Sequence, residues 1–218
     1  MPRPFLILCL LISSSLLAYS QSGAPAAITF SLDFPASQPE HYSIRVQSDG
    51  SAHYQSSGRL AADSDETDSF ELAFSVTAET RQKIFDLAAK AGYFQKDVDS
   101  HHKGIAFTGK KTLAYSDAHR SGESTYNYSS NSAVQDLTNL FQSLSTTLEF
   151  GHRLQYDRQY QKLALDEELK RMEEMVRSNA LVEVAAIQPI LDQIIADLSV
   201  INVTRARAQR LLERAGVH

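Results

Sequence analysis

Apolar and polar residues alternate along three segments in the first part of the chain. The alternation runs through residues 28–34, 42–54 and 70–76, where nearly every second side chain is apolar. A period of two residues is typical of a β-strand that has one face on a core. Asp49-Gly50 interrupts the middle segment, and this dipeptide is favoured in two-residue hairpin turns because both positions need positive φ. We therefore predict strands over these segments, with a hairpin inside 42–54.

Two further strand regions are predicted between residues 105 and 128. Apolar residues alternate on either side of Gly109-Lys110, at Ile105, Phe107, Leu113 and Tyr115. This pattern favours a second hairpin that turns at the Gly-Lys pair. Tyr126 and Tyr128 have the same spacing, which indicates one more short strand.

The hydrophobic period changes to that of a helix in two places. Thr77 is a typical N-cap for an amphipathic helix that ends at Gly92. Ser132 and Gln135 have the spacing of a capping box, and an apolar stripe follows at helical spacing to Leu148. One-sided strands and amphipathic helices together predict an α+β fold, an antiparallel sheet of about 5–6 strands covered by two helices.

Residues 151–218 contain no strand pattern, so we predict an all-α, bundle-like C-terminal segment. Asp166 and Thr204 are predicted as N-caps of two of its helices, and Pro189 suits the first turn of another. The last helix is expected to end at Gly216. A segment of about 65 residues is near the lower limit for an independent core, so we expect it to pack on the sheet domain.

The N-terminus has the pattern of a signal peptide over residues 1–20. Arg3 precedes an apolar stretch, and small residues stand three and one before a cut at Gln21. The predicted organisation is therefore a signal peptide (1–20), an α+β domain (21–150) and the helical segment (151–218). We expect an exported protein, periplasmic or secreted, without stable membrane insertion once the signal is removed. Cys9 is the single cysteine, so the exported chain would have no disulfide.

The charge distribution excludes one class of partner. Residues 21–150 carry 10 basic and 16 acidic side chains, and residues 151–218 carry 10 of each. Nucleic-acid binding needs clustered Lys and Arg that displace counterions from phosphates. An acidic first domain without a basic stripe therefore argues against a nucleic-acid partner.

The hairpin segment carries a resemblance to a known family. Residues 42–54 read Tyr-Ser-Ile-Arg-Val-Gln-Ser-Asp-Gly-Ser-Ala-His-Tyr and are followed by a strand and then a helix. This pattern resembles a family of exported bacterial domains of unknown function, in which a Tyr...Asp-Gly...Tyr hairpin precedes a covering helix. The resemblance spans residues 28–150, and residues 35–41 lack the paired cysteines that many members carry. It implies an α+β fold and export, and it implies no catalytic residue.

Three histidines are the first candidates for a metal or a catalytic site. His101 and His102 are adjacent, and His119 lies on a later segment. Adjacent residues on an extended chain point to opposite sides, and the helical spacing that places two histidines on one face is absent. We therefore interpret these residues as surface histidines and predict neither a metal nor a cofactor.

The leading functional hypothesis is a non-enzymatic binding module in the cell envelope, with an unidentified protein or ligand as its partner. Tyrosine rings are effective contact residues, so we name a candidate surface formed by Tyr42, Tyr54, Tyr115, Tyr126 and Tyr128, joined by His101, His102 and His119. The alternative is that most of these rings belong to the core. No catalytic residue is assigned.

Two other functions remain open at the level of the sequence. One is a secreted hydrolase with a dispersed site, in which Ser100 or His119 acts with a carboxylate brought near by folding. It requires a concave pocket in which a histidine lies within hydrogen-bond reach of both a serine and a carboxylate. The other is an inhibitor of a secreted hydrolase, an analogy that rests on the small helix-covered sheet.

Overall fold

The computed structural model describes residues 25–35, 37–59 and 67–216 of the 218-residue chain. The predicted signal segment, with Cys9, lies outside the described residues, so export stays a prediction. A single cysteine excludes an intrachain disulfide. Within the described ranges, no helix has both the length and the apolar character that a membrane crossing requires.

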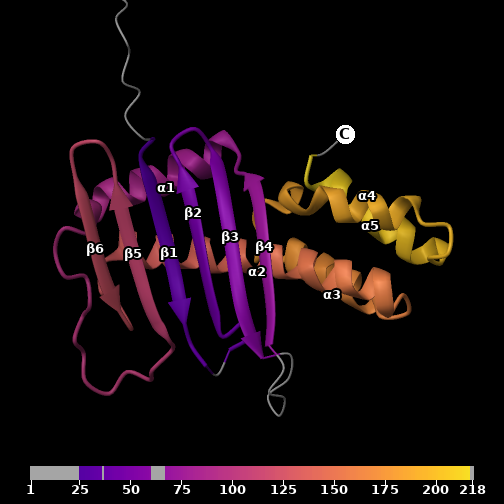
Figure 1. Ribbon diagram of the computed structural model, residues 1–218, viewed down its shortest axis with the longest axis horizontal. Helices are drawn as coiled ribbons and strands as arrows, with labels where there is room; N and C mark the ends of the chain where they lie inside the picture. Colours follow the sequence, from indigo (N-terminus) through magenta and orange to yellow (C-terminus); the bar gives the residue numbers. More distant parts are fainter. Residues whose placement is uncertain (1–24, 36, 60–66, 217–218) are drawn as a thin grey trace, which may run out of the picture.

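Six antiparallel strands form one sheet in the order β4-β3-β2-β1-β5-β6 (Figure 1). Their bounds are β1 Ala27–Asp33, β2 His41–Gln47, β3 Ser51–Arg59, β4 Thr67–Ser75, β5 Lys110–Ser116 and β6 Ser121–Tyr126. The first four strands form a meander, and the chain then crosses to the other side of β1. The predicted α+β fold with an antiparallel sheet is confirmed.

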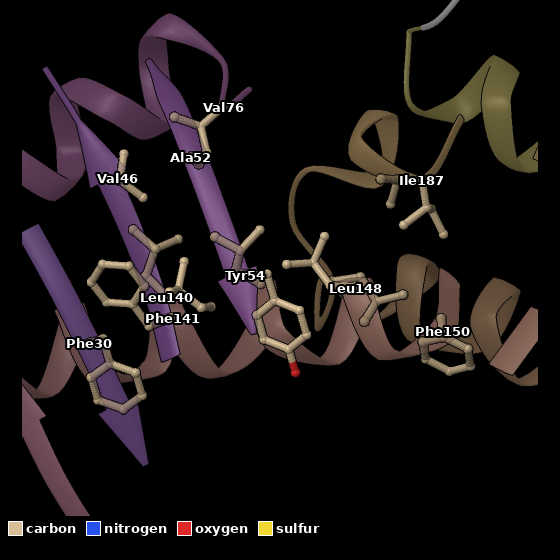
Figure 2. Close-up of a cluster of buried hydrophobic side chains, with 14 of the residues drawn as sticks. Phe30, Val46, Ala52, Tyr54, Val76, Leu140, Phe141, Leu148, Phe150 and Ile187 are labelled. Carbon is tan, nitrogen blue, oxygen red and sulfur yellow. The ribbon is translucent and has the colours of Figure 1, made fainter. Parts of the chain in front are cut away.

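Two helices cover one face of the sheet (Figure 1): α1, Ala78–Lys90, and the longer α2, Ser132–Tyr160. The core lies between these layers because the alternating apolar residues of the strands face the helical stripe of α2. Phe30 stacks on Phe141 with ring centroids 5.3 Å apart and planes at 4°. Figure 2 shows Tyr54 near Leu148, and both side chains are fully buried.

The opposite face of the sheet carries small polar side chains. The strand register places Ser31 of β1 between Ser43 of β2 and Thr112 of β5. It then continues the row to Gln55 of β3 and Thr125 of β6. No described helix packs on this face (Figure 1), which explains why its polar residues alternate with buried ones along every strand.

The first hairpin is confirmed, and its turn differs from the prediction. Strand β2 ends at Gln47 and β3 begins at Ser51, so the connection holds three residues instead of two. Gly50 alone takes a positive φ, +94°. Asp49 instead accepts hydrogen bonds from the backbone N–H of Ser51, at 2.9 Å, and from its hydroxyl, at 2.7 Å. The aspartate therefore stabilises the turn through its side chain.

The predicted hairpin around Gly109-Lys110 is wrong, because residues 105–109 form no strand. The Asn127 side chain accepts a hydrogen bond from the Thr108 N–H at 2.9 Å and donates one to the Ala106 carbonyl at 3.0 Å. These contacts replace strand pairing in this segment. The observed hairpin joins β5 to β6 through residues 117–120, and Tyr128 lies beyond the end of β6.

Helix starts were predicted with mixed success. Thr77 is confirmed as the N-cap of α1 and accepts a bond from the Thr80 N–H at 3.3 Å. The N-cap of α2 is Asn131, one residue before the predicted Ser132. Gln135 does not close a capping box, because its amide donates to the Ser129 carbonyl at 2.8 Å.

The helical tail is held to the sheet domain by one continuous core. It contains α3 (Leu165–Arg177), α4 (Gln188–Ala196), α5 (Asn202–Arg214) and the 3₁₀ turn η2 (Val184–Ile187). Helix α2 runs without a break through residue 150, and the tail clusters beyond the β4 edge (Figure 1). Glu183 accepts bonds from both the N–H and the hydroxyl of Thr77, which ties the tail to the β4–α1 junction.

Two predicted caps of the tail contact each other instead. Asp166 is the second residue of α3 and Thr204 is the third residue of α5, so neither is an N-cap. The Thr204 hydroxyl donates to Oδ1 of Asp166 at 3.2 Å, and Arg207 donates to the same oxygen at 3.1 Å. Pro189 does occupy the first turn of α4, as predicted. The last helix ends at Arg214, and Gly216 follows with a φ of +71°.

Candidate functional site

A cleft of about 280 Å³ lies where the C-terminal end of β3 and the N-terminal end of β4 face the second half of α2. The inward-facing residues of the two strands contribute Ser56, Asp68 and Phe70. The facing side of α2 contributes Glu149, His152, Arg153, Tyr156 and Asp157. The cleft thus combines charged and hydroxyl groups with two aromatic rings.

Glu149 forms the polar centre of the cleft. Its Oε1 accepts hydrogen bonds from the hydroxyl of Tyr54, at 2.6 Å, and from that of Ser56, at 2.7 Å. The side chain is 12% exposed. Burial raises the pKa of Glu149, but the nearby His152 and the hydrogen bonds from Tyr54 and Ser56 outweigh it and lower this pKa below its usual value. The carboxylate is therefore held in its charged form.

His152 connects Glu149 to the sheet. Its Nδ1 lies 3.7 Å from Oε2 of Glu149, and its Nε2 lies 3.3 Å from Oδ2 of Asp68. The ring stacks on Phe70, with centroids 4.3 Å apart and planes at 5°. Both ring nitrogens and one ring face are thus engaged, which fixes the position of the imidazole between two carboxylates.

The arginines at the cleft are paired with acids outside it. Arg59 donates to Oε1 of Glu40 at 2.8 Å. Arg153 donates to Glu168 and lies over the Phe150 ring, 4.6 Å from its centroid. Neither Glu40 nor Glu168 lines the cleft. Both guanidinium groups therefore form their hydrogen bonds with acids outside the cleft, although the charge of Arg153 still acts on Asp157.

Asp157 adds a third carboxyl group to the wall. Burial raises its pKa, and the negative charge of Glu168 raises it further, while Arg153 partly opposes both. The cleft therefore contains one carboxylate whose pKa is lowered, Glu149, and one whose pKa is raised, Asp157. Their different environments give them different proton affinities on one short stretch of α2.

The tyrosine surface proposed from the sequence does not exist as a surface. Tyr42, Tyr54, Tyr115 and Tyr126 are 7%, 0%, 6% and 3% exposed, because they occupy inward positions of the strands. Burial raises the pKa of Tyr115 and Tyr126 to about 12. Tyr128 alone is exposed, at 41%. The alternative reading, that most of these rings belong to the core, is confirmed.

The three histidines singled out in the sequence remain on exposed loops. His101 bonds Oδ2 of Asp97 at 2.7 Å, and this bond raises its pKa. His102 bonds the Lys103 carbonyl at 3.0 Å, and the His119 N–H donates to Asp117 at 2.7 Å. No described group of three or more His, Cys, Asp or Glu residues has the arrangement of a metal site.

The arrangement required for a dispersed hydrolase is only partly present. His152 contacts two carboxylates in the cleft, but the Ser56 hydroxyl donates to Glu149. A serine nucleophile needs its proton accepted by the histidine, so this serine is bonded to the wrong partner for that chemistry. Ser100 lies elsewhere, where its hydroxyl accepts the His102 N–H at 3.3 Å.

Sequence reasoning missed Glu149 and His152, although a signal was present. Ser145, Glu149, His152 and Tyr156 follow one another at intervals of four, three and four residues. This spacing places them on one face of a helix, next to the apolar stripe through Leu148. The apolar stripe of α2 that faces the core is thus continued by polar residues on the same face, and Glu149, His152 and Tyr156 line the cleft.

Comparison of the chain with protein-family models and with curated proteins finds no match. The resemblance of residues 28–150 to an exported family of unknown function therefore stays a prediction.

Proposed function

We propose that this protein is a non-enzymatic binding module whose cleft receives a cationic group of its ligand. The observation that carries the proposal is Glu149, a carboxylate that is 12% exposed and kept charged by two hydroxyl donors and His152. Among the described residues, its one ion-pair partner within 4.0 Å is His152. A ligand cation would supply the strong counter-charge that the protein itself does not place there.

The charges around Glu149 favour the same ligand class. Asp68 and Asp157 also line the cleft, and Arg59 and Arg153 are bonded to Glu40 and Glu168. An anionic ligand would meet three carboxyl groups, and the arginines of the cleft already bind Glu40 and Glu168, so a cation is favoured over an anion. The acidic balance of residues 21–150 adds a long-range attraction for cations.

The aromatic wall favours a guanidinium over an ammonium group. Tyr156 is 49% exposed and lines the cleft together with Phe70. A planar guanidinium stacks on aromatic rings and forms paired hydrogen bonds with a carboxylate, whereas an ammonium group is a compact point charge. The ligand class is therefore an arginine side chain of a peptide, or a small guanidinium compound, encountered where an exported protein would reside.

Isothermal titration calorimetry with arginine amide tests this function, and citrulline amide is the matched neutral control. We expect binding of arginine amide and an affinity for citrulline amide that is lower by about thirtyfold, because about 2 kcal/mol is typical when a buried charge loses its partner. Lysine amide is expected to bind between the two. Equal affinity for the charged and neutral probes, or no binding of either, would refute the proposal.

A further inference from the structure

The two edge strands of the sheet, β6 and β4, differ in the segments that pack against them. At the β6 edge, the Val98 N–H donates to the Ser124 hydroxyl at 3.0 Å, and the Asn127 N–H donates to Asp99 at 2.8 Å. The backbone of Tyr93 lies so close to Gly122 that a Cβ there would be 2.2 Å from its carbonyl oxygen. The segment after α1 thus packs along β6.

The outer edge of β4 has no comparable neighbour among the described residues. Strand β4 is nine residues long and pairs with β3 through its whole length, which leaves one side of its backbone without a strand partner. It contains no Pro, Lys or Arg, and its charged side chains are Asp68 near one end and Glu71 at the centre. Its outer N–H and C=O groups therefore form a template for another strand.

The side chains of β4 show that the core is incompletely covered there. Phe70, Leu72 and Phe74 point to the helix side and stay partly exposed, whereas Ile44 of β2 and Tyr54 of β3 are 0% exposed. Helix α2 and the tail extend past this edge (Figure 1). A strand added to β4 would extend the sheet over the part of the helical layer that reaches past this edge. Its side chains on the helix side would cover Phe70, Leu72 and Phe74.

The charge at this edge selects the chemistry of the added strand. Glu71 faces the open side of the sheet at the centre of β4, and Asp68 lies at its cleft end. His53 contacts Oε1 of Glu71 at 2.6 Å, and β4 itself carries no cation. Basic residues of the added strand that face the open side of the sheet would meet Glu71, and apolar residues that face the helices would meet Phe70, Leu72 and Phe74.

We infer that the β4 edge binds an extended peptide segment of a partner protein in which apolar and basic residues alternate. Main-chain hydrogen bonds to β4 provide affinity, and the alternation places apolar side chains toward the helices and basic side chains toward Glu71. This inference rests on the proposed function at one point: where the segment carries a basic residue in place of an apolar one on its helix-facing side, next to Asp68, that side chain would enter the cleft of Glu149.

The test uses capped synthetic peptides with the full chain. The probe alternates valine and lysine over the length of β4, and the control has the same composition with valines and lysines in separate blocks. We expect the alternating peptide to bind and the block peptide to bind at least about tenfold more weakly, since several backbone hydrogen bonds are at stake. Equal binding of both peptides would overturn the inference.

Backbone involvement is tested without changing the protein. N-methylation of alternate peptide residues blocks the N–H groups on one edge of the probe, and methylation in the other register blocks the opposite edge. We expect one register alone to abolish binding, and the outward amides of β4 to become protected from hydrogen exchange. Loss of binding in neither register, or protection that falls on β6 in place of β4, would refute strand addition at β4.

Two matched charge-reversal variants test whether Glu71 contributes to peptide binding. Glu71→Lys on β4 is expected to weaken the alternating peptide, while Glu123→Lys on the opposite edge strand is expected to leave its affinity unchanged. If the free chain is a dimer in sedimentation experiments and its β4 amides are already protected, the occupant is a second copy and the peptide assignment is wrong. Binding of arginine amide without discrimination between the two peptides would leave the cleft proposal standing and remove this one.

Discussion

The hydroxyl of Tyr54 donates a hydrogen bond of 2.6 Å to Oε1 of Glu149, although 95 positions separate the two residues in the chain. Tyr54 lies in the middle of the sheet with 0% exposure, and Glu149 lies at the polar continuation of the core-facing stripe of α2. The same hydroxyl lies 3.1 Å from the Ser145 hydroxyl. This contact joins the hydrophobic core to the cleft, so changes in either residue are expected to alter both stability and binding.

Substitution Tyr54→Phe removes one donor to Glu149 and keeps the ring in the core. We expect a loss of about 2 kcal/mol in the free energy of unfolding, the value typical of a hydrogen bond to a charged group, measured by urea denaturation. Tyr128→Phe is the control, because that hydroxyl accepts a bond from Gln135 at the exposed surface. A loss of the same size in both variants would show that the Tyr54–Glu149 hydrogen bond stabilises the fold no more than a hydrogen bond at the surface.

The pH dependence of the stability of Glu149→Gln tests whether Glu149 is charged in the folded protein. A carboxylate whose pKa is lowered in the folded state stabilises that state above its ordinary pKa, and this contribution is lost as the pH falls through the folded pKa. The stability difference between wild type and Glu149→Gln should therefore be full at pH 7 and shrink in acid. Chemical denaturation at several pH values measures it; a difference that grows toward acid pH has the wrong sign.

Gly151→Ala is expected to destabilise the protein, although Ala normally favours a helix over Gly by about 0.5–1 kcal/mol. A Cβ at Gly151 would lie 2.6 Å from Cγ2 of Ile187, so α2 and η2 would have to separate. We expect a cost of about 1–3 kcal/mol, typical of overpacking. The double variant with Ile187→Ala should lose less than the sum of the two single variants, and strict additivity would contradict the predicted contact.

Glu173→Ala tests the polar contact between α3 and α5. The Glu173 side chain is 3% exposed and is bonded to both Arg207 and Arg210. Removing one member of a buried ion-pair network leaves its partners without compensation, and we expect a loss of about 3 kcal/mol. Glu174→Ala, at the neighbouring exposed position, should change the unfolding free energy by less than about 0.5 kcal/mol. Thermal and urea denaturation of the two variants provide the comparison.

Local patterns predicted most of the elements, because hydrophobic period and helix capping act over a few residues. The strands from β1 to β4 and the helix after Thr77 follow directly from such patterns. The strand predicted over residues 105–109 is wrong because the Asn127 side chain, from another segment, forms hydrogen bonds with the backbone there. Alternation within the segment does not reveal this contact. Thr204 was read as a cap for a similar reason, since Asp166 is distant in sequence but adjacent in the fold.

The cleft was not predictable from local patterns for a related reason. Its central contacts join Tyr54 and Ser56 of β3, Asp68 of β4 and the pair Glu149 and His152 of α2. The spacing along α2 shows that its polar residues share a face, but the identity of the groups opposite them depends on how the helix crosses the sheet. Tyr42, Tyr54, Tyr115 and Tyr126 illustrate the converse, since alternation placed these four correctly on strands and their burial depends on the segments that cover the sheet.

The most direct measurement compares arginine amide binding to wild type, Glu149→Gln and Glu71→Gln by isothermal titration calorimetry at neutral pH. Glu149 is the carboxylate at the centre of the cleft, whereas Glu71 is exposed on the open face of the sheet. We predict that Glu149→Gln lowers the affinity by about thirtyfold and that Glu71→Gln leaves it within about twofold of wild type. Unchanged affinity in Glu149→Gln, or equal losses in the two variants, would contradict a cation-binding cleft centred on Glu149.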